Sequence, residues 1–386
     1  MVNLQRQRNK LARVLITGSD GFIGQNLRLL LSERQDLEVQ CFTKQHTPAQ
    51  LPEFVKHSDF IIHLAGVNRP QHPDEFQAGN VQLTQTLTDA VAHEAKASGR
   101  AITVILASST QAEQDNPYGL SKRQAEEVMS KLALEPCVSL HVFRLPNVFG
   151  KWCKPNYNSV VATFCHNMAR DLPVQVHDPN ALLSLVHVDD VLSHFVAIMD
   201  GKEPLLSPSG FAQVLPQYQI TVGQLAQTLT EFRESRITLT LQGVGVGLQR
   251  VLYSTYVSYL PQQAFAYDIP QYQDPRGTFV EMLKTGTTGQ ISYFTAHPGI
   301  TRGGHYHHTK TEKFLVIKGQ AQFRFRHMQT NEMHSLETSG DKPQVVETIP
   351  GWTHDITNTG AEDMLVMVWA NEIFDRAHPD TYRCPI

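Results

Sequence analysis

The pattern of apolar residues changes along this chain, and this change limits the possible folds more than any other feature of the sequence. From Arg13 to about residue 200, short apolar runs alternate with amphipathic stretches of helical length. After about residue 275 the runs are short and alternating, and Gly, Pro, Asn and Asp separate them. Strands that alternate with helices predict a doubly wound parallel sheet, whereas closely spaced strands without helices predict an all-β jelly-roll barrel. The sequence therefore predicts an α/β domain followed by a β-barrel domain.

The 386 residues are enough for two domains, and we expect the boundary near residues 261–275. This gives an N-terminal domain of residues 1–265 and a C-terminal domain of residues 266–386. The expected strands of the first domain are Val14–Ile16, Val39–Phe42, Phe60–Leu64, Thr103–Ala107 and Leu140–Arg144, and its expected helices are Phe22–Glu33, Glu75–Ala97 and Tyr118–Ala133. The expected strands of the second are Phe279–Leu283, Ile291–Thr295, Phe314–Lys318, Gln322–His327, Gln344–Ile349 and Met364–Trp369.

Composition excludes several classes of protein. No apolar run approaches the ~18 residues that cross a bilayer, and no signal peptide precedes the first strand. The net charge is −4 and there is no long basic block, so we expect neither nucleic acid nor membrane as a partner. The five cysteines are odd in number and never spaced C-x-x-C. These features predict a cytoplasmic protein without disulfides or a cysteine zinc site.

A glycine-rich loop joins the first strand to the first helix, with the spacing G-x-x-G-x-x-G. In this pattern Gly18 permits a tight turn, Gly21 permits close approach to a pyrophosphate, and Gly24 permits close packing of helix on strand. A plain turn is the alternative. The loop predicts a Rossmann-like dinucleotide domain, and its expected cofactor-binding residues are Gly18, Asp20, Gly21, Phe22, Ile23 and Gly24.

The end of the second expected strand bears on the choice of cofactor. Domains that prefer NAD carry an acidic residue there for the ribose hydroxyls, but here the strand ends in Cys41-Phe42-Thr43-Lys44. Thr43, Lys44 and Arg28 are candidates to bind a 2′-phosphate, which favours NADPH. Lys44 as a solvated loop residue is the alternative.

Tyr118 and Lys122 have the i, i+4 spacing that places two side chains on one helix face. A cation beside a phenol lowers the phenol's pKa, so we expect Lys122 to lower that of Tyr118. A serine of Ser108-Ser109 can hydrogen-bond the same oxygen. The set would transfer a proton to or from a carbonyl and alcohol pair, although such spacing also occurs on plain helix surfaces.

Together these motifs resemble the nucleotide-sugar branch of the extended short-chain dehydrogenase/reductase family, over about residues 12–200. Further matching segments are His63-Leu-Ala-Gly66, Asn80-Val81, Arg144-Leu-Pro-Asn147-Val-Phe-Gly150 and His187-Val-Asp-Asp-Val191. The resemblance implies that Leu64, Ala65, Gly66 and Lys122 contact the cofactor, that Ser109, Tyr118 and Lys122 are catalytic, and that Asn147 and His187 bind substrate. The spacing of nine residues between Ser109 and Tyr118 is shorter than usual for this branch, so Ser108 stays the alternative serine.

The segment after Asn147 offers further substrate contacts. Lys151 and Lys154 supply cations for a diphosphate, and Trp152 supplies a ring for stacking. An ordinary half-exposed loop is an equally good interpretation of these residues.

Histidines are concentrated at the C-terminal end, where residues 291–386 hold eight of the 18. One stretch has the spacing G-x5-H-x-H-x4-E-x6-G and contains His305, His307 and Glu312, and His354 follows Pro350-Gly351. Histidines at i and i+2 of a strand project to one face, and imidazoles with a carboxylate are usual ligands of a divalent transition metal. Histidines on a solvated strand are the alternative.

The histidine segment resembles the cupin family, which implies that His305, His307, Glu312 and His354 are metal ligands, with zinc the first choice among Zn, Fe, Mn and Ni. The second cupin motif departs from the usual pattern, because Gly340 lies ten residues before Pro350. Arg302-Gly-Gly-His305-Tyr306 is also similar to the metal-free sugar 3,5-epimerase branch, in which the histidine is a base. We favour His305 as a ligand, which leaves Tyr306 and His308, and more weakly Lys310 and His297, as candidates for proton transfer.

The whole chain resembles the CapF-type family of bifunctional capsular polysaccharide and O-antigen enzymes of UDP-N-acetyl-L-fucosamine biosynthesis. This implies C3 epimerisation of a UDP-2-acetamido-2,6-dideoxy-4-hexulose by the barrel. NADPH-dependent reduction at C4 would then give UDP-2-acetamido-2,6-dideoxy-L-talose. It also implies a homodimer. The alternative is a plain nucleotide-sugar 4-ketoreductase whose barrel is a structural, dimerising or regulatory sugar-binding module.

Overall fold

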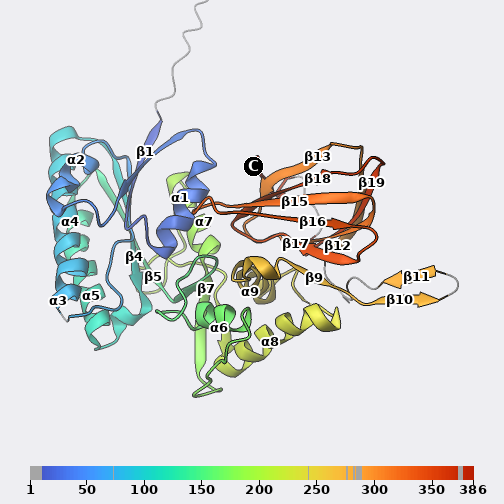
Figure 1. Ribbon diagram of the computed structural model, residues 1–386. Coiled ribbons are helices and arrows are strands. Elements are labelled where there is room, and N and C mark those ends of the chain that lie inside the picture. The colour runs from blue at the N-terminus through green and yellow to red at the C-terminus, as the bar shows by residue number, and fades with distance from the viewer. Residues whose placement is uncertain are drawn as a thin grey trace, which may run out of the picture. The chain divides into compact units, whose positions relative to one another are not determined.

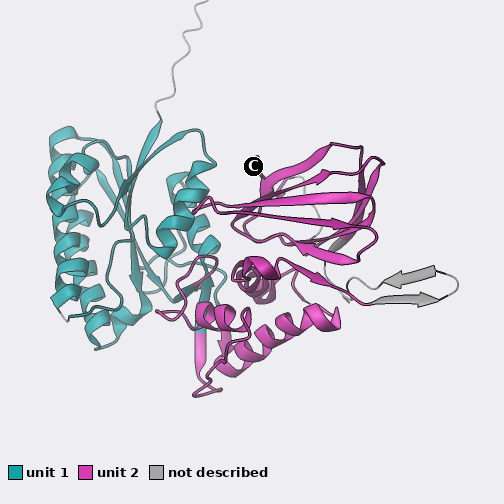
Figure 2. Cartoon of the chain, viewed as in Figure 1, with its two compact units in different colours: residues 1–148, 184–218 teal, residues 149–183, 219–386 magenta. Residues whose placement is uncertain are grey.

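The computed structural model describes residues 11–72, 74–241, 243–274, 277–280, 283, 289–372 and 377–386. The chain divides into two compact units (Figure 2). Unit 1 comprises residues 1–148 and 184–218, and unit 2 comprises residues 149–183 and 219–386. Residues 149–183 and 219–265 therefore group with the C-terminal strands, whereas the division of the chain at residue 265 stays a prediction.

Unit 1 is built on a parallel sheet of five strands in the order β2-β1-β3-β4-β5 (Figure 1). The strands are β1 (Ala12–Thr17), β2 (Leu37–Phe42), β3 (Phe60–His63), β4 (Ile102–Ser109) and β5 (Val138–Leu145). The helices are α1 (Phe22–Ser32), α2 (Leu51–Val55), α3 (Asp74–Phe76), α4 (Leu83–Ser98), α5 (Pro117–Ser130) and α7 (Val188–Met199). Short helical turns lie at Pro48–Gln50, Thr110–Glu113 and Lys131–Leu134, and a π-helix at Gln77–Gln82 precedes α4.

Apolar side chains cover both faces of this sheet. In β1, Val14 and Ile16 belong to one buried cluster with residues of α1 and α7, whereas Leu15 belongs to a second cluster with residues of α2, α4 and α5. Figure 1 shows the helices on the two sides of the strands. The expected Rossmann-like, doubly wound sheet is confirmed, and its strand order reverses between β1 and β3, where ligands of such sheets bind.

The described residues of unit 2 form three helices and two antiparallel sheets of five strands. The helices are α6 (Val160–Met168), α8 (Val222–Thr238) and α9 (Gly247–Ser258), and a short turn lies at Gln262–Ala264. One sheet has the order β12-β19-β14-β17-β9 and the other β16-β15-β18-β13-β20. Their strands are β9 (Ala266–Asp268), β12 (Gln290–Ala296), β13 (Thr301–Tyr306), β14 (Glu312–Lys318), β15 (Gln320–His327), β16 (Met333–Ser339), β17 (Gln344–Glu347), β18 (Trp352–Asn358), β19 (Met364–Ala370) and β20 (Tyr382–Arg383).

Aromatic side chains pack between these two sheets. Phe314 of β14 lies edge-on to Phe323 of β15 with ring centroids 5.6 Å apart, and both rings are buried. This packing of one antiparallel sheet on another confirms the cupin-like barrel.

A hairpin of β10 (Gln271–Asp274) and β11 (Gly277–Val280), and a sheet in the order β6-β7-β8, complete the described elements. The bounds of the latter strands are Asn147–Phe149, Leu182–His187 and Tyr218–Thr221.

Most of the expected barrel strands are present. The expected strand Phe279–Leu283 overlaps β11, but residues 281 and 282 lie outside the described residues.

All five cysteines are free thiols. None of the helices in the described part of the chain is both long and apolar enough to span a membrane.

Candidate functional sites

The glycine-rich loop lies at the reversal point of the unit 1 sheet. Gly18 has φ +70°, and a Cβ there would approach the backbone nitrogen of Ala65 to 2.6 Å. A Cβ on Gly24 would lie 2.6 Å from Cα of Ser19. Both positions therefore require glycine, as the sequence predicts. The N–H of Gly18 donates to the carbonyl of Phe42 at 2.9 Å, which holds the loop beside the end of β2.

Helix α1 begins directly after this loop with Gly21 as its N-cap and without an acidic residue in its first turn. Its first N–H groups and the positive end of its dipole suit a pyrophosphate. Asp20 forms an ion pair of 3.2 Å with Arg28. This contact engages Arg28, one of the three candidates for binding a 2′-phosphate.

The end of β2 carries a histidine that the sequence analysis did not single out. The N–H of Thr43 donates to Nδ1 of His46 at 3.1 Å, and the imidazole stacks on Phe42 with centroids 5.4 Å apart. Thr43 and Lys44 follow β2 directly, as expected. The end of the strand therefore presents the ring of His46 and the cation of Lys44, and the sequence supplies no carboxylate there.

His63 at the end of β3 is a structural residue. Its Nδ1 lies 2.6 Å from the hydroxyl of Thr17 and its Nε2 lies 2.9 Å from the hydroxyl of Thr84. Burial lowers the pKa of this imidazole to about 3, so it is neutral. It ties β1 and β3 to α4, and the segment Leu64–Gly66 follows directly beside the glycine loop.

Gly66 connects the expected cofactor segment to the expected catalytic residues. A Cβ on Gly66 would lie 3.0 Å from Oδ1 of Asn80 and 3.7 Å from Nζ of Lys122. Asn80 lies in the π-helix, and its amide bonds both the N–H and the carbonyl of Val67, at 2.6 and 3.0 Å. A π-turn of this kind is frequent at functional sites. Leu64–Gly66, Asn80 and Lys122 are therefore neighbours.

Tyr118 is placed by the start of α5. Asn116 caps the helix by accepting the N–H of Gly119 at 2.8 Å, and Pro117 occupies the first helical position. A Cβ on Gly119 would lie 2.6 Å from the carbonyl oxygen of Gln114, so only glycine allows α5 to approach the segment after β4 this closely. These features bring Tyr118 to the end of β4.

The two serines at the end of β4 have different partners. Ser109 hydrogen-bonds Tyr118, whereas the buried Ser108 donates to Glu126, which also binds Arg144. The structure therefore brings Ser109 rather than Ser108 to the phenol. Ser108 is more buried than Ser109, but both serines stand at the end of the same strand, so the sequence does not show this difference.

Lys122 is partly buried and donates to the carbonyl of Ala107 at 2.9 Å. Burial lowers its pKa to about 8, against the opposing effect of Glu126. Burial raises the pKa of Tyr118, and the hydrogen bond from Ser109 only partly offsets this. The pKa of Tyr118 is therefore raised rather than lowered, and desolvation of the phenol is the largest cause. The phenol keeps its proton at neutral pH, which suits a proton donor.

The other expected substrate residues of unit 1 have clear local roles. Asn147 is exposed, and its amide donates to the carbonyl of Ser184 at 3.1 Å. His187 is buried and caps α7, with Nδ1 accepting the N–H of Asp189 at 3.4 Å. The structure thus leaves Asn147 accessible and gives His187 a structural task.

In unit 2, the loop after Gly150 packs on the barrel. Lys151 is buried, and its Nζ lies 3.2 Å from Nδ1 of His308. Trp152 has φ +69°, and its ring lies 2.9–3.1 Å from the point where Gly351 would carry a Cβ. Lys154 is exposed and lies over the ring of Tyr157. Lys151 and Trp152 therefore contact barrel residues, and only Lys154 fits a half-exposed loop.

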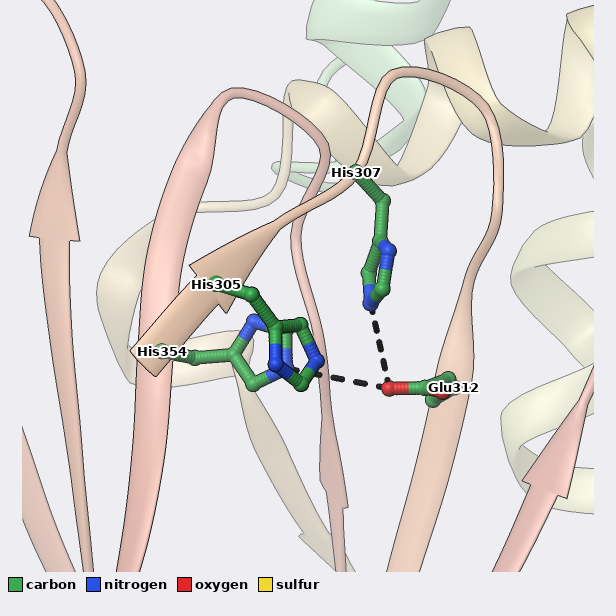
Figure 3. A group of neighbouring side chains, drawn as sticks. All are labelled: His305, His307, Glu312 and His354. Atoms are coloured by element: carbon green, nitrogen blue, oxygen red, sulfur yellow. Dashed lines mark hydrogen bonds and ion pairs between the residues drawn. The ribbon is translucent and has the colours of Figure 1, made fainter. Parts of the chain in front are cut away.

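The four expected metal ligands lie together inside the barrel (Figure 3). His305 on β13 pairs with His354 on β18, His307 follows the end of β13, and Glu312 begins β14. The ligand atoms of these residues all lie within 4.8 Å of one another. Oε2 of Glu312 lies 3.2 Å from Nε2 of His307 and 3.7 Å from Nε2 of His354.

This donor set fits a divalent transition metal. Neither ring nitrogen of the buried His354 has a hydrogen-bond partner among the residues that the structure describes, which is costly unless something else binds them. Burial and the neighbouring histidines lower the pKa of His305 to about 3, so its ring is neutral. Although burial raises the pKa of Glu312, the contacts with His307 and His354 hold it well below its usual value. Three histidines and one carboxylate suit zinc, iron, manganese or nickel.

The expected proton-transfer residues do not all lie at this cluster. Tyr306 stacks on Tyr382 with centroids 5.5 Å apart, and His308 lies edge-on to both rings. Since neighbouring residues of a strand project to opposite faces, Tyr306 lies on the face opposite to His305. The structure thus groups Tyr306 and His308 with Lys151, outside the set of four ligands, and their catalytic roles stay predictions.

The two weaker candidates are separated as well. His297 is exposed and pairs with Asp363 at 2.7 Å. Lys310 is buried, donates to the hydroxyl of Thr381 at 2.6 Å and lies 3.8 Å from Oε1 of Glu312. Lys310 is therefore the candidate that lies beside the four ligands.

Comparison with known proteins matches both parts of the chain. Residues 14–209 match the NAD dependent epimerase/dehydratase family, and residues 272–382 match a polysaccharide biosynthesis C-terminal domain. A UDP-2-acetamido-2,6-beta-L-arabino-hexul-4-ose reductase of Pseudomonas aeruginosa is 57% identical over 374 residues, which cover 97% of this chain and 99% of that protein. The crystal structure of the capsular polysaccharide assembling protein CapF of Staphylococcus aureus is 42% identical with a TM-score of 0.66, and the match covers 97% of this chain and 100% of that one.

Proposed function

The chain belongs to the NAD dependent epimerase/dehydratase family and is a CapF-type nucleotide-sugar enzyme, and on that premise we propose that it performs two successive reactions on one substrate. It is a reductase of a UDP-linked 4-keto sugar and uses a nicotinamide cofactor. The finer proposal is C3 epimerisation of UDP-2-acetamido-2,6-dideoxy-4-hexulose by the barrel. Reduction at C4 with NADPH then gives UDP-2-acetamido-2,6-dideoxy-L-talose, for capsule or O-antigen synthesis.

The observation that carries the reductase part is the convergence of Ser109, Tyr118 and Lys122 beside the glycine-rich loop. The reduced nicotinamide supplies the hydride for C4. Tyr118, kept protonated by its burial, donates a proton to the C4 oxygen, and Ser109 orients the phenol. Lys122 of α5, whose Nζ lies 3.7 Å from the point where Gly66 would carry a Cβ, would bind the cofactor ribose. Asn147 and His187 are proposed as substrate contacts on the basis of the family motif.

NADPH is proposed over NADH on the residues that follow β2. Thr43 and Lys44 lie directly after the strand, and the sequence has no acidic residue between positions 43 and 47. A carboxylate there would repel a 2′-phosphate, whereas a lysine attracts it. A comparison of kcat/KM for NADPH and NADH, with Lys44→Ala as the variant, tests this choice.

The barrel reaction is proposed from the four ligand atoms within 4.8 Å of one another. The C4 ketone makes the C3 proton acidic, so a base can remove it and a proton can return on the other face. A divalent metal, zinc foremost, held by His305, His307, Glu312 and His354 would supply positive charge beside the enolate oxygen. Tyr306 and His308 stay the proposed proton-transfer residues. Lys151, Trp152 and Lys154 are proposed to bind the sugar nucleotide.

A time course in D₂O separates this proposal from a plain reductase. Without NADPH, the wild-type chain should exchange the C3 proton of the 4-keto sugar for deuterium, and His305→Ala should stop this exchange. His297→Ala is the matched control, because that histidine is exposed and paired with Asp363. The Pseudomonas aeruginosa relative is named for reduction alone, which favours the plain reductase as second candidate. Absence of C3 exchange in the wild type would establish that second function.

The reductase assignment has its own test. Tyr118→Phe should lower NADPH oxidation at least about 100-fold, because it removes the proton donor. Tyr293→Phe is the control, since that side chain is 74% exposed on β12. We further propose a homodimeric, cytoplasmic enzyme with a domain boundary near residue 265. Size-exclusion chromatography with light scattering measures the first of these properties.

A further inference from the structure

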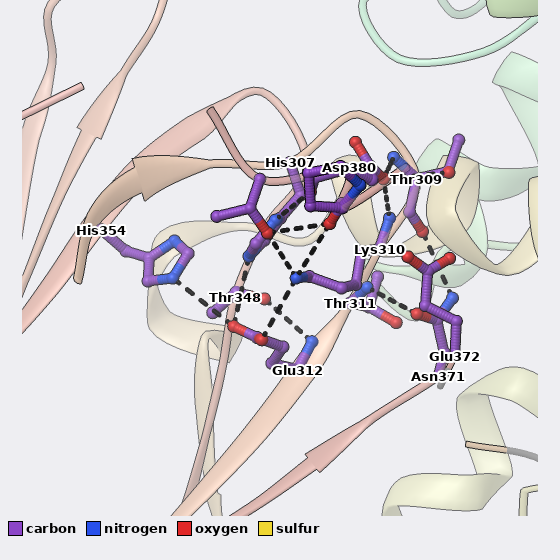
Figure 4. A network of polar contacts seen from close by, with 12 residues as sticks. His307, Thr309, Lys310, Thr311, Glu312, Thr348, His354, Asn371, Glu372 and Asp380 are labelled. Carbon is purple, nitrogen blue, oxygen red and sulfur yellow. Dashed lines mark hydrogen bonds and ion pairs between the residues drawn. The ribbon is translucent and has the colours of Figure 1, made fainter. Parts of the chain in front are cut away.

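The loop that joins two of the proposed ligands is held by one carboxylate from a distant part of the chain. This loop, residues 307–312, runs from His307 to Glu312. The backbone N–H groups of residues 308–310 all donate to the side chain of Asp380, at distances of 2.6–2.9 Å (Figure 4). The hydroxyl of Thr309 also donates to this carboxylate, at 3.2 Å. Asp380 is thus the common acceptor of three consecutive N–H groups.

The remaining N–H groups of the loop have side-chain acceptors as well. The N–H of Thr311 donates to Oδ1 of Asn371 at 3.0 Å, and the N–H of Glu312 donates to the hydroxyl of Thr348 at 2.9 Å. Both acceptors are buried. Each N–H from residue 308 to residue 312 therefore has a fixed partner, which restricts the loop far more than an ordinary turn.

Asp380 also contacts a ligand directly. Its backbone carbonyl lies 2.6 Å from Nδ1 of His307. A carbonyl can only accept, so Nδ1 of His307 donates this hydrogen bond, and Nε2 is the ring nitrogen that remains for the ligand cluster. That nitrogen faces Oε2 of Glu312 at 3.2 Å, inside the ligand cluster. The contact fixes the direction of this imidazole.

Backbone pairing holds Asp380 in place. Strand β20 pairs with β13 through His305 with Arg383 and Tyr306 with Tyr382, and the N–H of Cys384 donates to the carbonyl of Gly304 at 2.7 Å. Asp380 itself has φ +37°, a left-handed conformation that costs free energy for a residue other than glycine. The contacts with the 307–312 loop offset this cost.

We propose that Asp380 is a positioning residue of the metal site, which sets metal affinity by fixing His307 and the loop up to Glu312. This inference rests on the proposed function, since it requires that the four ligands hold a metal. Ligand histidines commonly donate their second N–H to a carbonyl or carboxylate, and loss of such a partner typically weakens metal binding about 10–100-fold. Asparagine at position 380 would keep one acceptor oxygen but would direct an NH₂ group at the loop N–H groups.

The experiment measures zinc affinity of the full-length chain by competition with a chromophoric chelator. Asp380→Asn should raise the zinc Kd about 10–100-fold. Asp363→Asn is the matched control, because Asp363 also accepts from a histidine, His297, on the exposed surface. Its zinc Kd should stay within about twofold of wild type. NADPH binding, followed by nicotinamide fluorescence, should be the same in all three proteins and reports the integrity of unit 1.

The outcomes separate this inference from the proposed function. A wild-type chain that binds no stoichiometric zinc would overturn the metal site itself. Wild-type binding together with an unchanged Kd in Asp380→Asn would overturn only the positioning role, even if that variant melts at a lower temperature. Should Asp380→Asn not fold, Thr348→Val removes the acceptor of the Glu312 N–H without a change of shape. A several-fold rise in its zinc Kd supports the inference, and an unchanged Kd overturns it.

Discussion

Replacement of Lys122 by methionine should stabilise the fold while it removes activity. The Lys122 amine is buried, and its pKa falls from 10.5 to about 8. Each pKa unit corresponds to about 1.4 kcal/mol, so holding the charged amine in the folded chain costs about 3 kcal/mol at neutral pH. Methionine avoids this cost and loses the hydrogen bond to Ala107, which contributes about 1 kcal/mol. The expected gain is about 2 kcal/mol at pH 7.

The dependence on pH gives the sharper test. Between pH 8 and pH 10.5 the unfolded chain holds the Lys122 proton and the folded chain does not, so the stability of the wild type rises with pH. The penalty is complete below pH 8 and falls below about 1 kcal/mol at pH 10. The advantage of Lys122→Met should therefore shrink, or reverse, as the pH rises from 7 to 10.

Urea unfolding of the full-length chain at both pH values measures this difference. Lys131→Met is the control, because Lys131 is exposed just after the same helix, and its effect should stay within about 0.5 kcal/mol. A Lys122→Met chain that is less stable than the wild type at pH 7, with an unchanged control, would refute the reasoning. So would a difference that does not vary with pH.

Three further predictions follow from contacts that pairs of variants can separate. Ser109→Ala should lower the reductase rate, because Ser109 acts through Tyr118. Ser108→Ala should mainly lower the free energy of unfolding, by about 1–3 kcal/mol, because it removes the buried partner of Glu126. Steady-state rates and urea midpoints distinguish the two variants, and the reverse pattern would contradict the choice of Ser109. Gly351→Ala should destabilise the chain by about 1–3 kcal/mol more than Gly299→Ala. Both glycines have φ near +80°, but of the two only position 351 would bring the new Cβ against Trp152. Equal urea midpoints of the two variants would contradict this packing. Gly24→Ala should weaken NADPH binding together with stability, because its Cβ would press on Ser19 in the glycine loop, and a titration by nicotinamide fluorescence that finds an unchanged Kd would contradict this.

Local spacing explains which features the sequence could predict. The glycine loop depends on spacing within one turn, and His305 and His307 depend on i, i+2 spacing. Glu312 and His354, which lie on β14 and β18, were expected from the resemblance to the cupin family, and the structure brings all four ligands together. Alternation along β13 directs Tyr306 to the face opposite His305, so the separation of Tyr306 from the ligands follows from the strand pattern, whereas His307 and His308 lie beyond the end of that strand. Strands β13 and β18 are missing from the expected strands, although the spacing of His305 and His307 assumes a strand there, because glycines, histidines and polar residues replace an apolar alternation.

Features that depend on distant partners could not be predicted. Nothing near Asp380 in the sequence indicates that it binds a loop some 70 residues earlier, and the acceptors Asn371 and Thr348 lie 60 and 36 residues after their donors Thr311 and Glu312. Lys151 was expected at a diphosphate, but its partner in unit 2 is His308, 157 residues further along the chain. The pKa of Tyr118 was misjudged for a related reason, since helical spacing shows that Lys122 is near but not how deeply the phenol is buried.

The two proposed reactions compete for the C4 ketone of the substrate. The C3 configuration of the product therefore depends on the activities of both sites. Epimerisation at C3 requires the C4 ketone, and reduction removes it, so sugar that is reduced first can no longer be epimerised. The ratio of the two C3 epimers in the product therefore reports the rate of the barrel relative to the rate of the reductase. A variant that weakens only the metal site, such as Asp380→Asn, should shift this ratio toward the unepimerised alcohol while NADPH oxidation continues. Ser109→Ala should shift it in the opposite direction, because slower reduction leaves more time for exchange at C3. Variants that change both rates but leave the epimer ratio constant would contradict two independent sites.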